Sequence, residues 1–231
     1  RAGIKLWAFV TSLVPAVKMR EIALYGSQVI KVTGSYDQAK QVAAEFARQR
    51  GLYQDMGART ITSIEAMKTI AFEIVEQLTS ILGPDPNNST KRTKPLWRTP
   101  NWYIQAISGG MGPLGIAKGF RELVDMGLID RIPAIAPIQA SGCAPMVNAW
   151  KDGLDNAIPI PSPRTLIETL ATGDPGRVYP LLKKWVKDTN GTFESVSDEE
   201  AFRAMHVLAK MEGISAEPAA AAPSRLQSAG L

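Results

Sequence analysis

Residues 102–115 read WYIQAISGGMGPLG, an apolar run followed by closely spaced glycines and the start of a second apolar pattern. The run over 102–107 is typical of a buried strand. Pro113 suits the first turn of a helix, because the N–H that proline lacks has no partner there. The sequence therefore predicts a strand, a glycine turn over 108–112 and a helix over 113–126, which is the unit from which α/β proteins are built.

The same alternation of strand and helix continues on both sides of this unit. Before it, apolar patterns predict strands at 6–10 and 28–33 and helices at 16–25, 35–50 and 63–82. After it, they predict strands at 134–140, 192–196 and 214–216 and helices at 144–150, 164–172, 176–188 and 198–212, the last opened by a capping box at Ser197. The predicted fold class is therefore α/β, in three layers, with a mostly parallel sheet and helices on both faces.

Composition narrows the possible functions. The 231 residues are 45% hydrophobic and 21% charged, as in an ordinary globular protein. One cysteine excludes a disulfide scaffold or a multi-cysteine metal site, and one histidine leaves little for a histidine-based triad. The only basic cluster, at 91–98, lies in a proline-rich stretch, which favours a solvated loop over a nucleic-acid patch. We therefore expect no nucleic-acid partner. No apolar run approaches the roughly 18 residues of a membrane span, so we also expect no membrane partner, and we expect a cytoplasmic location.

The glycine turn carries the strongest chemical signal. Glycines let backbone N–H groups approach an anion, and a helix N-terminus adds unpaired donors and the positive end of its dipole. The turn also follows a strand, at the edge where open α/β sheets bind ligands. We predict that a phosphate is held by Ser108, Gly109, Gly110, Met111 and Gly112. The alternative is a tight turn that binds no ligand.

A dinucleotide is one phosphate ligand to weigh. Gly110, Gly112 and Gly115 fit the spacing G-x-G-x-x-G, but that fingerprint also needs an acidic residue about 20 positions later, at the end of the next strand. The next strand ends in QAS at 139–141, without a carboxylate. The chain also lacks the P-loop pattern G-x-x-x-x-G-K-[ST], which argues against a P-loop NTPase.

Further segments stand in a specific order around the turn. They are GI at 3–4, YG at 25–26, VIKVTGSYDQA at 29–39, EAMKTIAFEI at 65–74, KGF at 118–120, GLIDRIP at 127–133, QASGCAP at 139–145, SDEE at 197–200 and EGISAEPAAA at 212–221. Each piece alone is weak, but their joint order and spacing resemble the threonine synthase branch of the fold-type-II pyridoxal-phosphate-dependent enzymes, the tryptophan synthase β-subunit-like group.

The resemblance implies a function and a domain plan. Residues 1–55 would be the latter part of a small domain and residues 56–231 most of a large, cofactor-binding domain, an incomplete two-domain fold-type-II arrangement. The cofactor would be pyridoxal 5′-phosphate, with its phosphate on the backbone N–H groups of residues 108–112. The reaction would be a β,γ-elimination or replacement by a lyase or synthase acting on a small amino acid. We expect the full-length protein to be a homodimer.

The resemblance also has gaps. The Schiff-base lysine of the family precedes the GI segment and the partner of the pyridine nitrogen follows EPAA, so we expect a chain truncated at both ends that has no turnover alone. No catalytic residue is assigned. Thr60 and Ser63 stand where threonine synthases carry Asn and Arg, and Ala66 replaces a glycine, which puts threonine synthesis itself in doubt. The alternative function is a non-catalytic α/β module that binds a phosphorylated small molecule or a partner chain.

Four other residues have a functional and a structural interpretation. We favour a surface charge over a cofactor contact for Lys68, a buried small residue over a reactive thiol for Cys143, and a helix-surface residue over a catalytic base for His206. For Glu217 both interpretations stay open. The resemblance places it in the cofactor pocket, and the pattern Glu-Pro alone is typical of a turn.

Overall fold

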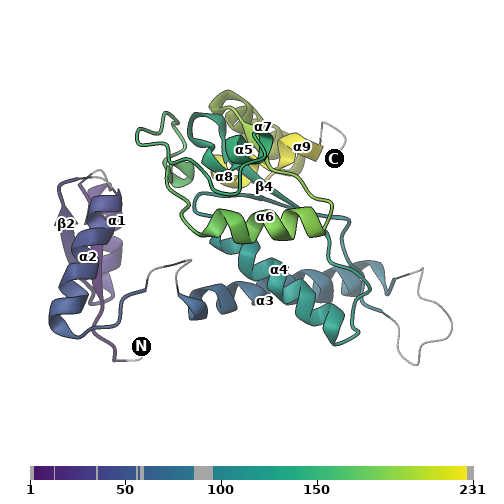
Figure 1. Ribbon diagram of the computed structural model, residues 1–231, viewed down its shortest axis with the longest axis horizontal. Coiled ribbons are helices and arrows are strands. Elements are labelled where there is room, and N and C mark those ends of the chain that lie inside the picture. The colour runs from purple at the N-terminus through teal and green to yellow at the C-terminus, as the bar shows by residue number, and fades with distance from the viewer. Residues whose placement is uncertain are drawn as a thin grey trace. The chain divides into compact units, whose positions relative to one another are not determined.

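A computed structural model of the chain describes residues 3–12, 14–34, 36–55, 57, 60–85 and 96–227. It divides into two compact units, Arg1–Met56 and Gly57–Leu231. Figure 1 shows the first unit in purple and blue and the second in blue to yellow. Each unit is described by itself.

The first unit is a parallel strand pair with two helices. Strands β1 (Trp7–Thr11) and β2 (Gln28–Val32) pair in parallel, and α1 (Ala16–Leu24) supplies the crossover that a parallel pair needs. Helix α2 (Tyr36–Arg50) follows and packs the ring of Phe46 5.0 Å from that of Trp7. The strands and helices predicted here are confirmed, with bounds that differ by one residue.

The second unit contains a three-stranded parallel sheet. Its strands are β3 (Trp102–Ala106), β4 (Ala134–Ala140) and β5 (Glu194–Val196), in the order β3-β4-β5. The register places Trp102 opposite Ala134 and Ile138 opposite Glu194. Six of the seven residues of β4 are buried, as expected for the central strand of a sheet that is covered on both faces.

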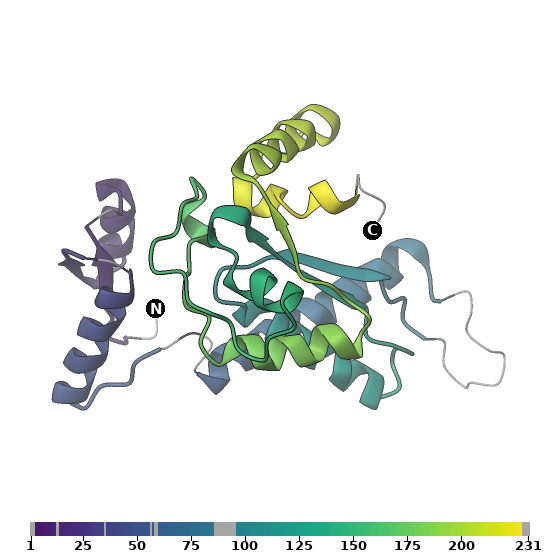
Figure 2. The same ribbon diagram turned by 45° about the horizontal axis from the view of Figure 1, so that its top comes forward.

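Helices cover both faces of this sheet (Figure 2). On one face lie α4 (Met111–Asp125), α5 (Pro145–Lys151) and α6 (Val178–Asp188), with α3 (Ile61–Leu82) packed against α4. On the other lie α7 (Asp198–Glu212), α8 (Pro218–Ala221) and α9 (Ser224–Gln227). The side chain of Ile135 belongs to the core under α6, and that of Ile138 to the core under α7 and α8. The predicted three-layer α/β fold is therefore confirmed.

Two predicted elements are wrong. Residues 164–172 form no α-helix and contain only a single 3-10 turn at Glu168–Leu170. The backbone N–H of Leu166 donates to the Asp198 carboxylate (2.7 Å), and the Thr165 hydroxyl does the same (2.5 Å), so distant partners replace helical hydrogen bonds. Residues 214–216 form no strand, because no neighbouring strand pairs with them in the described chain, and Ile214 is exposed.

Candidate functional site

Residues 108–112 lie where β3 leads into α4, and the helix begins at Met111, two residues earlier than predicted, so that Met111 and Gly112 form its start. Gly110 is the N-cap of α4 and has φ 80°, in the left-handed region that favours glycine. A Cβ at Gly110 would lie 3.0 Å from Val178 Cγ1, 3.1 Å from Met146 Cε and 3.3 Å from Leu182 Cδ2. The backbone conformation therefore favours glycine at this position, and a side chain there would also be in tight contact with three neighbours.

The backbone donors of the turn have no acceptor in the part of the chain that the structure describes. Among the residues that the structure describes, the backbone N–H groups of residues 108–112 donate to no backbone or side-chain acceptor, and α4 has no side-chain cap. A Cβ at Gly109 would meet no atom within 4 Å, so the turn is open on that side. Unpaired N–H groups at a helix N-terminus attract an anion, because the helix dipole has its positive end there. The geometry suits a phosphate group.

The hydroxyl of Ser108 fixes one side of the turn. It donates a short hydrogen bond to the Thr172 hydroxyl and accepts one from the Thr172 backbone N–H at 3.2 Å. The segment that follows the 3-10 turn at Glu168–Leu170 is thereby tied to the start of the glycine turn. Sequence reasoning missed Thr172, because it lies 64 residues from Ser108 and belongs to no motif there.

Two further glycines hold α4 close to α3. A Cβ at Gly115 would lie 2.3 Å from the Ile64 carbonyl oxygen, and one at Gly119 would lie 2.8 Å from the Lys68 carbonyl oxygen. These approaches bring the two helix backbones into direct contact. They fix the position of α4, whose first turn carries the open donors.

Four charged side chains join the same two helices. The Lys68 ammonium donates to Glu122 (2.8 Å) and lies 2.6 Å from a Glu65 carboxylate oxygen, and Lys118 pairs with Glu65 as well. The hydrogen bonds to Glu122 and Glu65 raise the pKa of Lys68, and those from Lys118 and Lys68 lower the pKa of Glu65. A lysine with a raised pKa stays protonated at neutral pH and is a poor nucleophile. Lys68, only 17% exposed, is therefore an ion-paired link between helices, which corrects its interpretation as a surface charge.

The other candidate residues have structural surroundings. The Cys143 thiol is buried just after β4, and burial raises its pKa, which is the opposite of what a reactive thiolate needs. His206 is exposed on α7. Glu217 is the N-cap of α8, and its carboxylate accepts a hydrogen bond from the Thr169 hydroxyl at 2.6 Å. Among the described residues, no cluster of His, Cys, Asp or Glu could hold a metal ion, and no helix is long and apolar enough to span a membrane.

Gln139 is a buried polar residue near the turn that sequence reasoning also missed. Its Oε1 accepts hydrogen bonds from the backbone N–H groups of Met146 (2.9 Å) and Val147 (3.2 Å), which begin α5. Met146 in turn packs against Gly110. The signal in the sequence is a single amide in an otherwise apolar strand, AIAPIQA. Gln139, in β4, thus fixes the start of α5, where Met146 packs against the glycine turn.

Comparison with known proteins agrees with this fold. The chain matches the model of the pyridoxal-phosphate dependent enzymes over residues 1–225. It is 31% identical to threonine synthase from Methanocaldococcus jannaschii, over 88% of this chain and 46% of that protein. It is 30% identical to threonine synthase from Methanosarcina acetivorans, over 95% of this chain and 51% of that protein. The chain spans about half the length of these curated relatives.

A solved structure shows the same fold. Serine racemase from maize superimposes with a TM-score of 0.72 at 19% identity, over 99% of this chain and 62% of that one. An identity this low supports the fold and nothing finer. Because the family match covers nearly the whole sequence and the α/β architecture agrees with it, the chain belongs to the family of pyridoxal-phosphate dependent enzymes.

Proposed function

We propose that residues 108–112 hold the phosphate of pyridoxal 5′-phosphate. The observation that carries this proposal is the set of backbone N–H groups without acceptors in the described chain at the start of α4, next to the open space at Gly109. When bound, the cofactor supplies an electron sink for a carbanion at the Cα of an amino acid. The described residues contribute binding. The turn donates hydrogen bonds to the phosphate, and Thr172 orients the Ser108 hydroxyl beside it.

We further propose a β,γ-elimination or replacement for the full-length protein, with a small amino acid as substrate. The threonine synthase relatives support this reaction class. The substrate itself stays open, because the positions matching the Asn and Arg of threonine synthases carry Thr60 and Ser63, which offer no cation to a phosphorylated substrate. We assign no Schiff-base lysine in this chain. Lys68 and Lys118, on the helices nearest the turn, are both engaged in ion pairs.

The phosphate site can be tested by binding, without turnover. Pyridoxine 5′-phosphate carries the same ring and phosphate but lacks the aldehyde, so it cannot form imines with surface lysines. We expect the wild-type chain to bind pyridoxine 5′-phosphate saturably, which a titration followed by the ³¹P NMR shift of the ligand measures. Inorganic phosphate should compete for the same site. Gly110→Ala should weaken binding by about tenfold or more, or about 1.4 kcal/mol, because the new methyl group forces the turn away from its left-handed conformation.

The matched control is Gly213→Ala. Gly213 ends α7 with φ 67°, and no atom lies within 4 Å of its Cβ position, so this change strains a left-handed glycine without touching the turn. The affinity of the Gly213→Ala variant for pyridoxine 5′-phosphate should equal that of the wild type. Equal affinity in the Gly110→Ala variant, with its fold intact by circular dichroism, would refute the phosphate site.

A further inference from the structure

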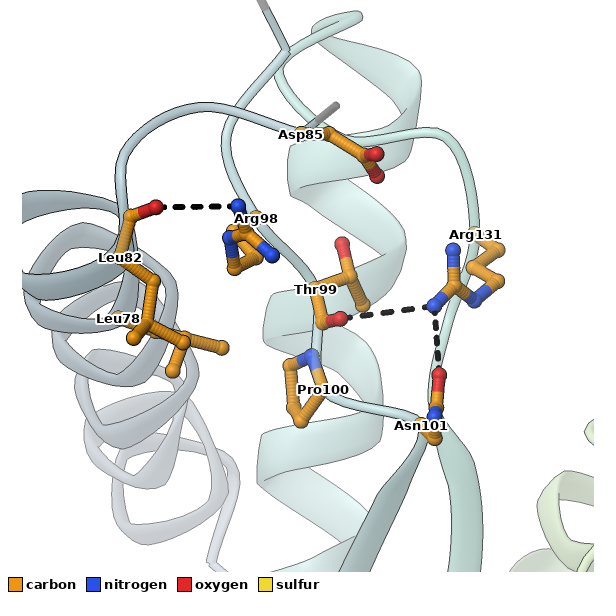
Figure 3. Close-up of a pocket in the computed structure, with 8 residues that line it drawn as sticks. All are labelled: Leu78, Leu82, Asp85, Arg98, Thr99, Pro100, Asn101 and Arg131. Atoms are coloured by element: carbon orange, nitrogen blue, oxygen red, sulfur yellow. Dashed lines mark hydrogen bonds between the residues drawn. The ribbon is translucent and has the colours of Figure 1, made fainter. Parts of the chain in front are cut away.

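A cavity lies away from the glycine turn, beside the segment that enters β3. It has a volume of about 370 Å³, and its lining includes Leu78, Leu82, Asp85, Arg98, Thr99 and Arg131 (Figure 3). Pro100 and Asn101 separate Thr99 from the first residue of β3, so the cavity lies at the amino end of that strand and the turn at its carboxyl end. Ligand pockets usually measure about 300–1,000 Å³, so this one suits a small metabolite.

Thr99 is the residue that points to a ligand. It is only 5% exposed, and its Oγ1 has no hydrogen-bond partner among the described residues. Figure 3 shows this hydroxyl directed toward the space between Arg98 and Arg131, on the side of Asp85. Buried hydroxyl groups are nearly always hydrogen-bonded, because leaving one unpaired forfeits its hydration. A hydrogen-bonding group of a ligand in the cavity would satisfy it.

The Arg98 guanidinium gives the cavity a fixed positive charge. It donates to the carbonyl oxygens at the end of α3, which are those of Leu82 (3.0 Å), Gly83 (3.1 Å) and Pro84 (3.1 Å). These acceptors carry no formal charge but stand at the negative end of the α3 dipole, so they hold the side chain in place and offset only part of its charge. A rigidly held guanidinium is well suited to a carboxylate ligand, because little side-chain entropy remains to be lost on binding.

Arg131 adds a second cation on the opposite wall. It donates to Asn101 Oδ1 at 3.0 Å and reaches the Thr99 carbonyl oxygen at 3.5 Å. It also pairs with Asp130, 3.3 Å away and 43% exposed, and a pair this exposed neutralises the arginine only in part. Asp85, which also interacts with another part of the chain, contributes one carboxylate to the lining. Among the residues that the structure describes, the lining therefore includes two cations and one carboxylate near the Thr99 hydroxyl.

The part of the lining that α3 contributes is apolar. Leu78 and Leu82 stand one turn apart on α3 and face the cavity together. The cavity thus combines cations with a buried hydroxyl, a carboxylate and an aliphatic wall. An α-amino acid with an aliphatic side chain carries the three complementary groups, which are a carboxylate, an ammonium and a branched hydrocarbon.

We propose that this cavity is a second ligand site, which binds a small aliphatic α-amino acid. The ligand carboxylate accepts from the Thr99 hydroxyl and lies between Arg98 and Arg131, the ammonium faces Asp85, and the aliphatic side chain packs on the leucines of α3. The site belongs to the Gly57–Leu231 unit and shares no residue with the phosphate turn, so it is independent of the function proposed above.

Three related probes test each recognition element. L-leucine carries all three groups, 4-methylpentanoate lacks its ammonium, and 3-methylbutylamine lacks its carboxylate. We expect calorimetric titration of the chain to give saturable binding of L-leucine. Binding of each of the other two should be weaker by about tenfold or more, the effect of losing one charged contact.

The decisive variant is Thr99→Val, which replaces the hydroxyl with a methyl group of similar size. We expect it to weaken L-leucine binding severalfold while the melting temperature without ligand stays equal or rises, because the wild-type hydroxyl has no partner to lose among the described residues. Asp85→Asn should weaken L-leucine binding and leave 4-methylpentanoate binding unchanged. The control Asp152→Asn removes an exposed carboxylate that does not line the cavity and should bind L-leucine normally.

Three results would overturn the proposal. The first is absence of saturable L-leucine binding to a chain that circular dichroism shows to be folded. The second is 4-methylpentanoate binding as tightly as L-leucine, which would make this a site for simple carboxylates. The third is a Thr99→Val variant that melts lower and binds L-leucine as before, since its hydroxyl would then be structural.

Discussion

Gly112 and Gly115 lie in the first turns of α4, yet their surroundings differ. A Cβ at Gly112 would lie 2.6 Å from Gln105 Nε2, the far end of a flexible side chain. A Cβ at Gly115 would lie 2.3 Å from the Ile64 carbonyl oxygen, which belongs to the backbone of α3. Only the second neighbour is unable to move away without shifting a helix.

This difference predicts opposite results for the same substitution. Replacing a helical glycine by alanine normally stabilises a helix by about 0.5–1 kcal/mol. Gly115→Ala should instead lower the free energy of unfolding by about 1–3 kcal/mol, because the methyl group overpacks the contact between the two helices. Gly112→Ala should be close to neutral. Urea unfolding of both variants measures this, and equal stabilities would show that α4 can withdraw from α3.

Single residues also show which parts of the site the sequence alone predicts. The sequence predicts the glycine turn at residues 108–112 because its signal is local, a strand, a run of glycines and a proline in the next helix. It does not predict the pairing of Ser108 with Thr172 or the support that Gln139 gives Gly110 through Met146. These contacts depend on where the tertiary fold brings distant segments, and neither Thr172 nor Gln139 stands in a recognisable pattern.

At the scale of elements, the start of α7 is the clearest case of a predicted local structure. The Ser197 hydroxyl accepts from the Glu200 backbone N–H (3.1 Å), and the Ser197 backbone N–H donates to the Glu200 carboxylate (2.9 Å), so the predicted capping box is confirmed. Ser197→Ala should cost about 1 kcal/mol of stability, since it leaves a helical N–H without its acceptor. Chemical denaturation at neutral pH checks this value.

The same capping box predicts a pH dependence. The hydrogen bond from the Ser197 backbone N–H lowers the pKa of Glu200 below its ordinary 4.5. A carboxyl whose pKa is lower in the folded state stabilises the protein above its unfolded pKa, and this contribution is lost as the pH falls through the folded value. The stability deficit of Glu200→Gln should therefore be present at pH 7 and shrink in acid.

A neighbouring residue provides the control for this experiment. Glu199 pairs with Arg203 on the exposed surface of α7, 2.9 Å apart, and takes no part in the capping box. Glu199→Gln should have little effect at pH 7, as is usual for exposed pairs. Urea unfolding of both variants at neutral and acidic pH separates the two cases. A deficit of Glu200→Gln that grows as the pH falls would contradict the assignment.

The two incorrect predictions, a helix at 164–172 and a strand at 214–216, have the same cause. Residues 164–172 have helix-forming composition, but the side chain of Asp198 and the backbone of Gly142 take their hydrogen bonds. Residues 214–216 are apolar enough for a strand, but they pair with no strand of the described sheet. In both places the chain's own tertiary contacts outweigh local preference, and a single sequence does not contain that information.

At the scale of the whole molecule, the division at residue 56 bears on the domain prediction. We propose that Arg1–Met56 is the latter part of a small domain and Gly57–Leu231 most of a large cofactor-binding domain. The three buried core clusters and both proposed ligand sites consist of residues from the second unit. We therefore expect that unit to fold by itself.

A shortened chain tests this proposal. Residues 57–231 expressed without the first unit should unfold cooperatively on heating and bind pyridoxine 5′-phosphate with an affinity close to that of the 231-residue chain. Thermal circular dichroism and the ³¹P titration measure the two properties. A fragment that lacks a cooperative transition would show that the second unit depends on residues 1–56 for its fold.

The close contact at Gly115 and Gly119 has a consequence for ligand affinity. A slide of α4 along α3 by one residue would drive larger side chains into the carbonyl groups of Ile64 and Lys68, so the axial position of α4 is locked. The amides at its leading end are therefore stationary before an anion arrives. Association then forfeits little conformational entropy, and the affinity for a phosphate ester is set mainly by the exchange of its hydration shell for those amides.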